Sequence, residues 1–382
     1  MAPRLTVILS GMIAGDPHQG GATWAVLQYA LGFRRLGHDV YFVEPVAAKA
    51  LRPAGALAAS DNAAYFRRVV ADFGLADRAA LLLAGARETV GLTHVELVRA
   101  AARADVLVNI SGLLTDEAIT GRVARRVYLD LDPAFNQFWH TQGVDVRFAG
   151  HTHFVTIALA LGRPDCPVPT CGREWVTTVQ PVVLEHWPVA GEVVHDALTT
   201  VGNWRAYGSV EHGGVFYGQK AHALRPLFDL PRRTDERFLL ALAIHPGETK
   251  DLAALAENGW GLLDPARVAA TPADYRRFVR GSRAEFGLAK SGYAAARCGW
   301  FSDRSVCYLA SGRPVIAQET GFSRFLPTGK GLLAFETADD VLAGIEALRR
   351  DYAGHARAAR GLAEEFFDSD KVLPRLLEQV GN

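Results

Sequence analysis

Two hydroxyls, a carboxylate and a guanidinium stand together at Ser302, Asp303, Arg304 and Ser305, within the stretch CGWFSDRSVCYLASGRPVIAQETGF of residues 298–322. An apolar run of helical spacing follows them, and serine is a favoured N-cap, so the pattern predicts that a helix begins here. The first turn of a helix has free backbone N–H groups and the positive end of the dipole, which together stabilise a phosphate. Arg304 could add a bidentate contact to phosphate oxygens. The alternative is an ordinary capped helix whose charged residues face water.

Two other apolar runs end in basic or donor groups. Gly202, Trp204 and Arg205 follow one predicted strand, Lys220 opens the next helix, and Lys290 ends another strand in EFGLAKSGY. Glycine permits close approach of the backbone, and lysine or arginine can neutralise a diphosphate. Solvent exposure is the simpler interpretation for any one lysine. Together, the three strand ends favour an anion site.

The elements that must position these residues follow a repeating order. Residues 5–10 are an apolar run of strand length, a glycine-rich loop covers 11–21, a helical pattern runs over 22–37, and a second strand spans 38–45. This order predicts a βαβ unit with a right-handed crossover and a parallel sheet. Residues 104–112, 125–133, 153–162 and 175–184 are predicted as further buried strands.

The pattern starts again after a hinge near residues 185–192. We therefore predict an α/β protein with two Rossmann-like, doubly wound domains that face a central cleft, followed by C-terminal helices. The expected boundaries are 1–187 for an N-terminal domain, 193–350 for a C-terminal domain, and 351–382 for helices that pack back on the N-terminal domain. In open parallel sheets ligands bind outside the carboxyl ends of the strands, so the loops there should carry the function.

Composition excludes several classes. The 382 residues are 49% hydrophobic, enough for two cores, and 41 basic side chains balance 41 acidic ones, which argues against a nucleic-acid partner. The N-terminal apolar run is too short to span a membrane and lacks a signal-peptide cleavage site, so we expect a cytoplasmic protein without a membrane partner. The four cysteines fit no zinc framework. Dinucleotide, P-loop, nucleophile-elbow and zinc-protease motifs are missing.

Three stretches resemble the GT-B glycosyltransferases, which transfer a sugar from a nucleoside diphosphate. VGNWR followed by GQKAH resembles the family's first C-terminal strand, and CYLASGRPVIAQETGF resembles its helix and Gly-x-Pro-Val-Ile-Ala strand. GDPHQGGATWAVLQYALGFRRLGHDVYFVEP resembles its N-terminal glycine-rich loop, helix and Gly-His-x-Val strand. The resemblance covers most of the chain and implies a nucleotide sugar bound to the C-terminal half.

By this resemblance the donor site is built from Gly202, Trp204, Arg205, Lys220, Ser302, Asp303, Arg304, Ser305, Gln318, Glu319 and Thr320, with Lys290 nearby. Gln318, Glu319 and Thr320 would hydrogen-bond the sugar hydroxyls. Gly20 and Gly21 would bring backbone N–H groups to the phosphate from the opposite domain. The sequence departs from the family where retaining members carry a glutamate pair, because Gly299 and Cys307 stand at those positions. Inverting and retaining outcomes both stay open.

The implied chemistry needs a base for the acceptor. His18 lies in the loop after the first strand and suits this role, with Asp16 as a second candidate and Asp130 or Asp132 as the orienting carboxylate. No metal and no cofactor beyond the donor is expected. The expected acceptor is a soluble small molecule, such as a natural product, and the protein is expected to be a monomer or homodimer.

Two alternatives share these features. One is a nucleotide-sugar epimerase or hydrolase of the same fold. The other is a non-catalytic protein that only binds a nucleotide sugar, which the missing glutamate pair suggests.

Overall fold

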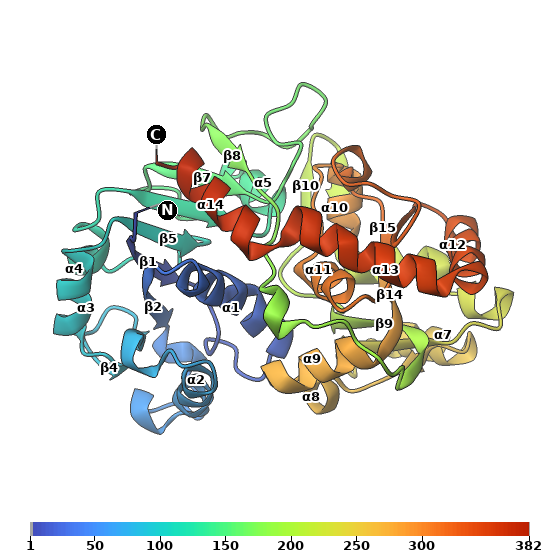
Figure 1. Ribbon diagram of the computed structural model, residues 1–382, viewed down its shortest axis with the longest axis horizontal. Helices are drawn as coiled ribbons and strands as arrows, with labels where there is room; N and C mark the ends of the chain where they lie inside the picture. Colours follow the sequence, from blue (N-terminus) through green and yellow to red (C-terminus); the bar gives the residue numbers. More distant parts are fainter. Residues whose placement is uncertain (1–2, 382) are drawn as a thin grey trace.

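The computed structural model describes residues 3–381 and shows two α/β domains beside each other (Figure 1). The N-terminal sheet has eight strands in the order β4-β3-β2-β1-β5-β6-β7-β8, and every neighbouring pair is parallel except β3 and β4. Its strands are β1 (Thr6–Ser10), β2 (Asp39–Val46), β3 (Ala79–Leu83), β4 (Thr89–Gly91), β5 (Val106–Ile110), β6 (Arg126–Asp130), β7 (His153–Thr156) and β8 (Trp175–Thr177). The central strands are buried on both faces, as an apolar strand covered by helices must be.

Helices cover both faces of this sheet. Local sequence explains where they begin: the Ser60 hydroxyl caps α2, and Thr93 with Glu96 forms a capping box at α3. The helices are α1 (Gly20–Arg35), α2 (Asp61–Asp72), α3 (His94–Ala101), α4 (Glu117–Thr120) and α5 (Phe135–Thr141).

The C-terminal sheet has six parallel strands in the order β13-β12-β9-β14-β15-β16. They are β9 (His195–Asn203), β12 (Phe238–Ala243), β13 (Gly261–Leu262), β14 (Ser282–Gly287), β15 (Val315–Gln318) and β16 (Leu332–Phe335), and β10 (Val210–His212) pairs with β11 (Val215–Tyr217) in a separate hairpin. The helices are α6 (Lys220–Leu224), α7 (Thr249–Glu257), α8 (Pro265–Val268), α9 (Pro272–Gly281), α10 (Ser291–Ala296), α11 (Asp303–Ala310) and α12 (Ala338–Arg350).

Both sheets are doubly wound, which confirms the predicted fold class. The strand order reverses between β1 and β5 in one domain and between β9 and β14 in the other. Such switch points open a crevice at the carboxyl ends of the strands, where α/β proteins bind ligands. Among residues 3–381, no helix is long and apolar enough to cross a membrane.

The end of the chain joins the two domains. Helix α13 (Tyr352–Leu362) packs on α11, and after a π-helical turn (Ala363–Phe367) α14 (Ser369–Gln379) packs on α1 (Figure 1). The contact with α1 is close at Gly32, where an added Cβ would lie 2.4 Å from a Leu373 methyl group. Arg35 of α1 also pairs with Asp370 of α14.

Candidate functional site between the two domains

A cavity of about 1120 Å³ lies between the domains. Its wall comes from the glycine-rich loop after β1, from the ends of β5, β9 and β12, and from the start of α11. Of the residues predicted from the sequence, those that line it are His18, Gly20, Gly21, Asp132, Gly202, Lys220, Lys290, Ser302, Asp303 and Arg304. The cavity thus occupies the place that the strand topology predicts for a ligand.

Lys220, the first residue of α6, points into this cavity without a partner. Its exposed fraction is 8%, and its ammonium makes no hydrogen bond or ion pair with any residue of 3–381. Burial, with Arg304 and Lys290 nearby, lowers the pKa of this ammonium well below its usual range. Gly202 makes room for its aliphatic chain, since an added Cβ would lie 3.3 Å from the Lys220 Cε. A buried cation without a carboxylate is costly, and an anionic ligand would remove that cost.

Arg304 differs from Lys220, because acceptors within the protein bind the N–H groups of its guanidinium. Its exposed fraction is 7%, and its Nε donates to the Glu285 carboxylate at 2.5 Å. The two terminal nitrogens donate to the carbonyls of Val201, at 3.1 Å, and Leu288, at 3.3 Å. The guanidinium therefore ties the ends of β9 and β14 together, and it does not offer a free fork for the bidentate phosphate contact expected from the sequence.

The start of α11 faces the cavity as predicted. The Ser302 hydroxyl accepts from the Arg304 N–H at 3.3 Å, so Ser302 is the N-cap. Asp303 lines the cavity, and burial raises its pKa although Arg304 opposes the shift. Ser305 is buried and does not line the cavity. The positive end of the α11 dipole and Lys220 thus act on the same space.

Trp204 and Arg205 lie outside the cavity wall. Trp204 is a core residue whose indole N–H donates to the Asp251 carboxylate at 3.0 Å. Arg205 forms an ion pair with Glu248 at the surface. Both side chains therefore position the loop after β9 without lining the cavity, unlike the direct ligand contacts expected for them.

Gln318, Glu319 and Thr320 also lie outside the wall, and their side chains hydrogen-bond backbone groups of the turn after β15 and of the neighbouring loops. The Glu319 carboxylate accepts from the Gly321 N–H at 2.5 Å, and the Thr320 hydroxyl donates to the Trp300 carbonyl. Gln318 is likewise engaged, since its amide oxygen accepts a backbone N–H at 3.2 Å. The sequence predicted that these side chains would hydrogen-bond sugar hydroxyls. In the structure their polar atoms hydrogen-bond backbone groups of the protein instead.

On the N-terminal side, His18 is oriented by a residue that the sequence did not indicate. Its Nε2 lies 2.9 Å from the Asp61 carboxylate at the start of α2, and its ring packs edge-on against Tyr65. The backbone of His18 is left-handed, with φ of 65°. Asp16, the second candidate base, pairs with Arg52 at 3.1 Å and does not line the cavity.

The loop that carries His18 is anchored by a buried carboxyl group. Glu44, at the end of β2, is fully buried and accepts from the N–H groups of Ala14 at 2.8 Å and Gly15 at 2.6 Å. Burial raises the pKa of Glu44 to about 7, although these backbone donors oppose the shift. This carboxyl group fixes the path of the glycine-rich loop into the cavity.

Gly20 and Gly21 are places where the two domains lie in close contact. The Gly20 N–H donates to the Ala269 carbonyl at 2.9 Å, and an added Cβ would lie 2.3 Å from the Thr271 carbonyl oxygen. At Gly21 a Cβ would lie 2.8 Å from the Tyr275 ring. Glycine is thus required here for contact between the domains, and the Gly20 N–H is not free for the phosphate contact expected of it.

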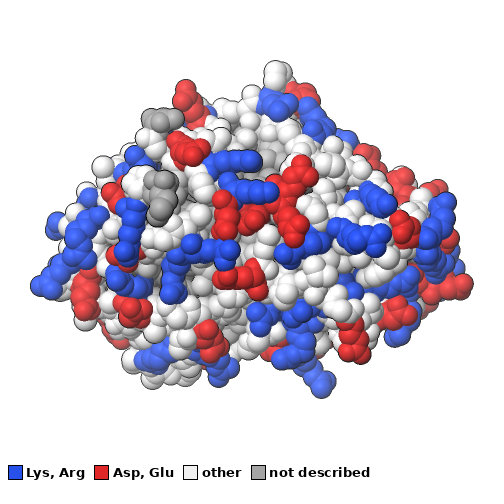
Figure 2. Space-filling view, in the orientation of Figure 1, with Lys and Arg blue, Asp and Glu red and all other residues white. Residues whose placement is uncertain are grey.

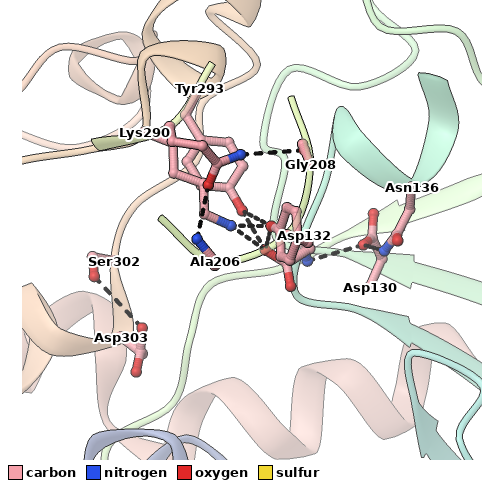
Figure 3. Close-up of polar contacts among 11 residues, drawn as sticks. Asp130, Asp132, Asn136, Ala206, Gly208, Lys290, Tyr293, Ser302 and Asp303 are labelled. Atoms are coloured by element: carbon pink, nitrogen blue, oxygen red, sulfur yellow. Dashed lines mark hydrogen bonds and ion pairs between the residues drawn. The ribbon is translucent and has the colours of Figure 1, made fainter. Parts of the chain in front are cut away.

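Four polar side chains connect the domains across the cavity (Figure 3). Asp132 follows β6, and its Oδ1 accepts from the Lys290 ammonium at 3.1 Å and the Tyr293 hydroxyl at 2.6 Å. Tyr207 hydrogen-bonds both Asp132 and Lys290. Although burial opposes ionisation, Lys290 and the two hydroxyls hold the pKa of Asp132 below its usual range. Asp132 is therefore an ionised carboxylate whose Oδ1 is held by side chains of the C-terminal domain, and the partner of His18 is Asp61 instead.

Asp130, the other carboxylate proposed to orient His18, is a structural group. It is fully buried and accepts from the Asn136 and Gln137 amides, both at 2.7 Å, and from the Thr156 hydroxyl at 3.1 Å. Burial raises its pKa to about 6. These contacts join the ends of β6 and β7 to α5.

Asp61, Tyr207 and Tyr293 belong to the site but were not predicted. Only Tyr293 carried a local signal, since it stands three residues after Lys290 at the start of a helix. Within residues 3–381, no three His, Cys, Asp or Glu side chains gather in a way that could hold a metal ion.

No family model and no curated protein matches the chain. Solved structures do. Anabaena Alr3699/HepE in complex with UDP and glucose shares 13% identity at a TM-score of 0.59, over 98% of this chain and 99% of that one. An alpha-glucosyltransferase in complex with UDP and a mismatched 13-mer DNA shares 10% at 0.62, over 100% of both chains.

Sucrose-phosphate synthase from Thermosynechococcus elongatus shares 12% identity at a TM-score of 0.55, over 98% of this chain and 99% of that one. All three are GT-B glycosyltransferases. The chain has the GT-B fold. At 10–13% identity the likeness concerns the arrangement of the two domains, so the role of each residue rests on the geometry described above.

Proposed function

We propose that this protein is a glycosyltransferase that takes a sugar from a nucleoside diphosphate. The observation that carries the proposal is Lys220, a buried ammonium that has no partner among residues 3–381 and points into the cavity between two GT-B domains, beside the start of α11. A diphosphate placed there would neutralise Lys220 and accept from the first turn of α11. The GT-B neighbours whose complexes contain UDP or UDP-glucose support a nucleoside diphosphate as the class of ligand.

An apolar part of the same cavity suits the nucleobase. It lies at the ends of β12 and β13 and is lined by Leu242, Ile244, Leu252, Leu262 and Pro265. A flat base can bury its faces against such aliphatic walls, while its ribose and diphosphate lie toward Lys220. UDP is the first nucleotide to test, since the neighbouring structures contain it.

The acceptor would enter from the N-terminal side, where Met12, Val26, Ile110 and Leu131 line the cavity near His18. We propose a soluble small molecule, such as a natural product, as the acceptor. Some neighbouring structures contain DNA. This chain has equal numbers of acidic and basic residues, and Figure 2 shows both signs interspersed over the face it displays. A nucleic-acid acceptor would favour a continuous basic surface.

In an inverting transfer, His18 would take the proton of an acceptor hydroxyl while Asp61 stabilises the imidazolium. The acceptor oxygen then bonds to the anomeric carbon as the bond from that carbon to the β-phosphate oxygen breaks. Lys220 and the α11 dipole stabilise the charge that develops on the departing diphosphate, so the proposed reaction does not require a metal ion.

The test is calorimetric titration of the full-length protein with UDP, GDP, ADP and TDP, followed by assays of nucleotide release from the matching sugar donors with a panel of small-molecule acceptors. We expect one diphosphate to bind and its sugar to be consumed in an acceptor-dependent way. If none of the diphosphates binds, the proposal is wrong. Equal sugar release without an acceptor would instead identify a hydrolase or epimerase, and saturable binding without turnover would identify a sensor.

A further inference from the structure

A second cavity, of about 1010 Å³, shares no lining residue with the first. It is formed by α1 and α2 of the N-terminal domain, the 3₁₀ turn Leu184–His186, and the start of α9 in the C-terminal domain. In Figure 1 these helices lie below α13 and α14, which run across the front of the molecule. The second cavity therefore spans both domains and the segment that connects them.

Three aromatic side chains pack together on one side of the second cavity. The ring of Trp24 lies 5.2 Å from that of Phe73 and 5.7 Å from that of His186, and the latter two rings are 5.9 Å apart. Phe73 and His186 are half-buried, so each keeps some surface open. Burial lowers the pKa of His186, which leaves a neutral ring at pH 7. Trp24 is only 1% exposed, so Phe73 and His186 provide the aromatic surface that the flat ring of a ligand could contact.

The rim of the second cavity is basic. Its charged residues are Arg34, Arg35, Arg68, Asp72, Glu185 and Arg276. Arg34 donates to two backbone carbonyls, and Arg35 pairs with Glu185 at 2.5 Å. In contrast, Arg68 of α2 and Arg276 of α9 make no hydrogen bond or ion pair with any residue between 3 and 381. Figure 2 shows basic side chains over α1 and α9 on this face.

Arg276 is the less exposed of these two arginines. Its side chain is half-buried, and burial together with the like charge of Arg280 lowers its pKa. A partly desolvated guanidinium with no protein acceptor is unfavourable, and a bound anion would satisfy its donors. The half-buried aromatic side chains thus favour a ligand with a ring, and the arginines of the rim favour a ligand with an anionic group.

We propose that the second cavity binds a small organic anion with a flat ring. The ring packs against the half-buried side chains of Phe73 and His186, and the anionic group is held by Arg68 of one domain and Arg276 of the other. Since the two arginines belong to different domains, such a ligand links them at a place separate from the donor cavity. The proposal is independent of the glycosyltransferase assignment.

The probe is 8-anilinonaphthalene-1-sulfonate, which combines flat rings with a sulfonate, titrated by fluorescence into the full-length protein. The double variant Arg68→Gln/Arg276→Gln should raise its dissociation constant by roughly tenfold or more, as expected for lost charged hydrogen bonds. The matched control Arg67→Gln/Arg277→Gln changes the same charges on the same two helices. Both of its arginines are exposed and neither lines the second cavity, so binding should stay within about twofold of wild type.

Lys220→Met tests whether the probe occupies the donor cavity instead, and thermal melts confirm that every variant is folded. Three results would overturn the proposal: no saturable binding by the wild type, an equal loss in the control double variant, or a loss in Lys220→Met that the arginine variants do not show. UDP affinity is measured separately on the same proteins. A failure of the second site can therefore be told apart from a failure of the donor site.

Discussion

Replacing Lys220 by methionine should affect stability and ligand binding in opposite directions. Methionine keeps most of the length of the aliphatic chain but removes the buried ammonium. The unfolded chain binds a proton on this lysine up to a pH of about 10.4, whereas burial makes the folded protein release it at lower pH. Below the pKa of the unfolded lysine, the buried Lys220 therefore lowers the free energy of unfolding. The variant without ligand should thus be more stable than the wild type.

The sign of the pH dependence follows from the same linkage. As the pH rises toward the pKa of an unfolded lysine, the unfolded chain loses its excess proton and the cost to the wild type disappears. The stability difference between variant and wild type should thus be larger at pH 7 than at pH 9.5. In a domain of this size, each kcal/mol gained raises the melting temperature by about 2–4 °C.

Binding of UDP should weaken in the same variant. Loss of a hydrogen bond to a charged group costs roughly 1.5–3 kcal/mol, which corresponds to about a 10- to 150-fold rise in the dissociation constant. Lys250→Met is the matched control, because Lys250 is exposed on α7 and does not line the cavity. Lys250→Met should leave both the free energy of unfolding and the dissociation constant of UDP unchanged.

The assays are calorimetric titration with UDP and urea unfolding at the two pH values. A variant that is less stable than the wild type without ligand would mean that Lys220 has a structural partner. Unchanged UDP affinity would mean that the diphosphate does not lie against it. Either result refutes the reasoning, since a lysine kept for ligand binding must lower stability and raise affinity together.

Arg304→Ala should lower the free energy of unfolding by about 3–5 kcal/mol, because Glu285 would be left buried and unpaired. A loss below about 1 kcal/mol in urea unfolding would contradict this pairing. His18→Ala and Asp61→Asn should each lower kcat by about 10²-fold or more with little change in UDP affinity. Unchanged initial rates would remove His18 as the base. Because burial raises the pKa of Glu44 from 4.5 to about 7, the unfolding free energy should fall as pH rises through that window. Glu44→Gln should make this slope less steep in denaturant titrations between pH 4.5 and 7.5, while the buried Asp130, whose pKa is raised to about 6, keeps its own contribution.

Much of the fold could be predicted because its signals are local. The pattern over residues 38–45 became β2 (Asp39–Val46), and that over 104–112 became β5 (Val106–Ile110). Residues 153–162 were expected to form one strand, yet β7 ends at Thr156. The apolar residues that follow are buried against the other domain, where the Ala160 N–H donates to the Cys298 carbonyl. An apolar run shows that a segment is buried, but it does not show against which surface.

The candidate site was predictable only at the level of strand ends. Lys220 and the start of α11 were found because parallel strands bring their carboxyl ends to one edge of the sheet. Arg304 lines the same cavity but is committed to Glu285, and Trp204 was predicted to bind the donor but is committed to Asp251. A motif predicts where a residue lies along the backbone. It does not predict with which neighbour the side chain will form a hydrogen bond or an ion pair.

The sequence by itself determined the two doubly wound domains and the edge at which a ligand would bind, because hydrophobic periodicity and glycine positions act over a few residues. Only the tertiary structure decided which charges stay unpaired. The partners Asp132 and Lys290 are 158 positions apart in the chain, and His18 and Asp61 are 43 apart. Pairing depends on distance through space, so the unpaired ammonium of Lys220 could be recognised only after every nearby carboxylate had been placed.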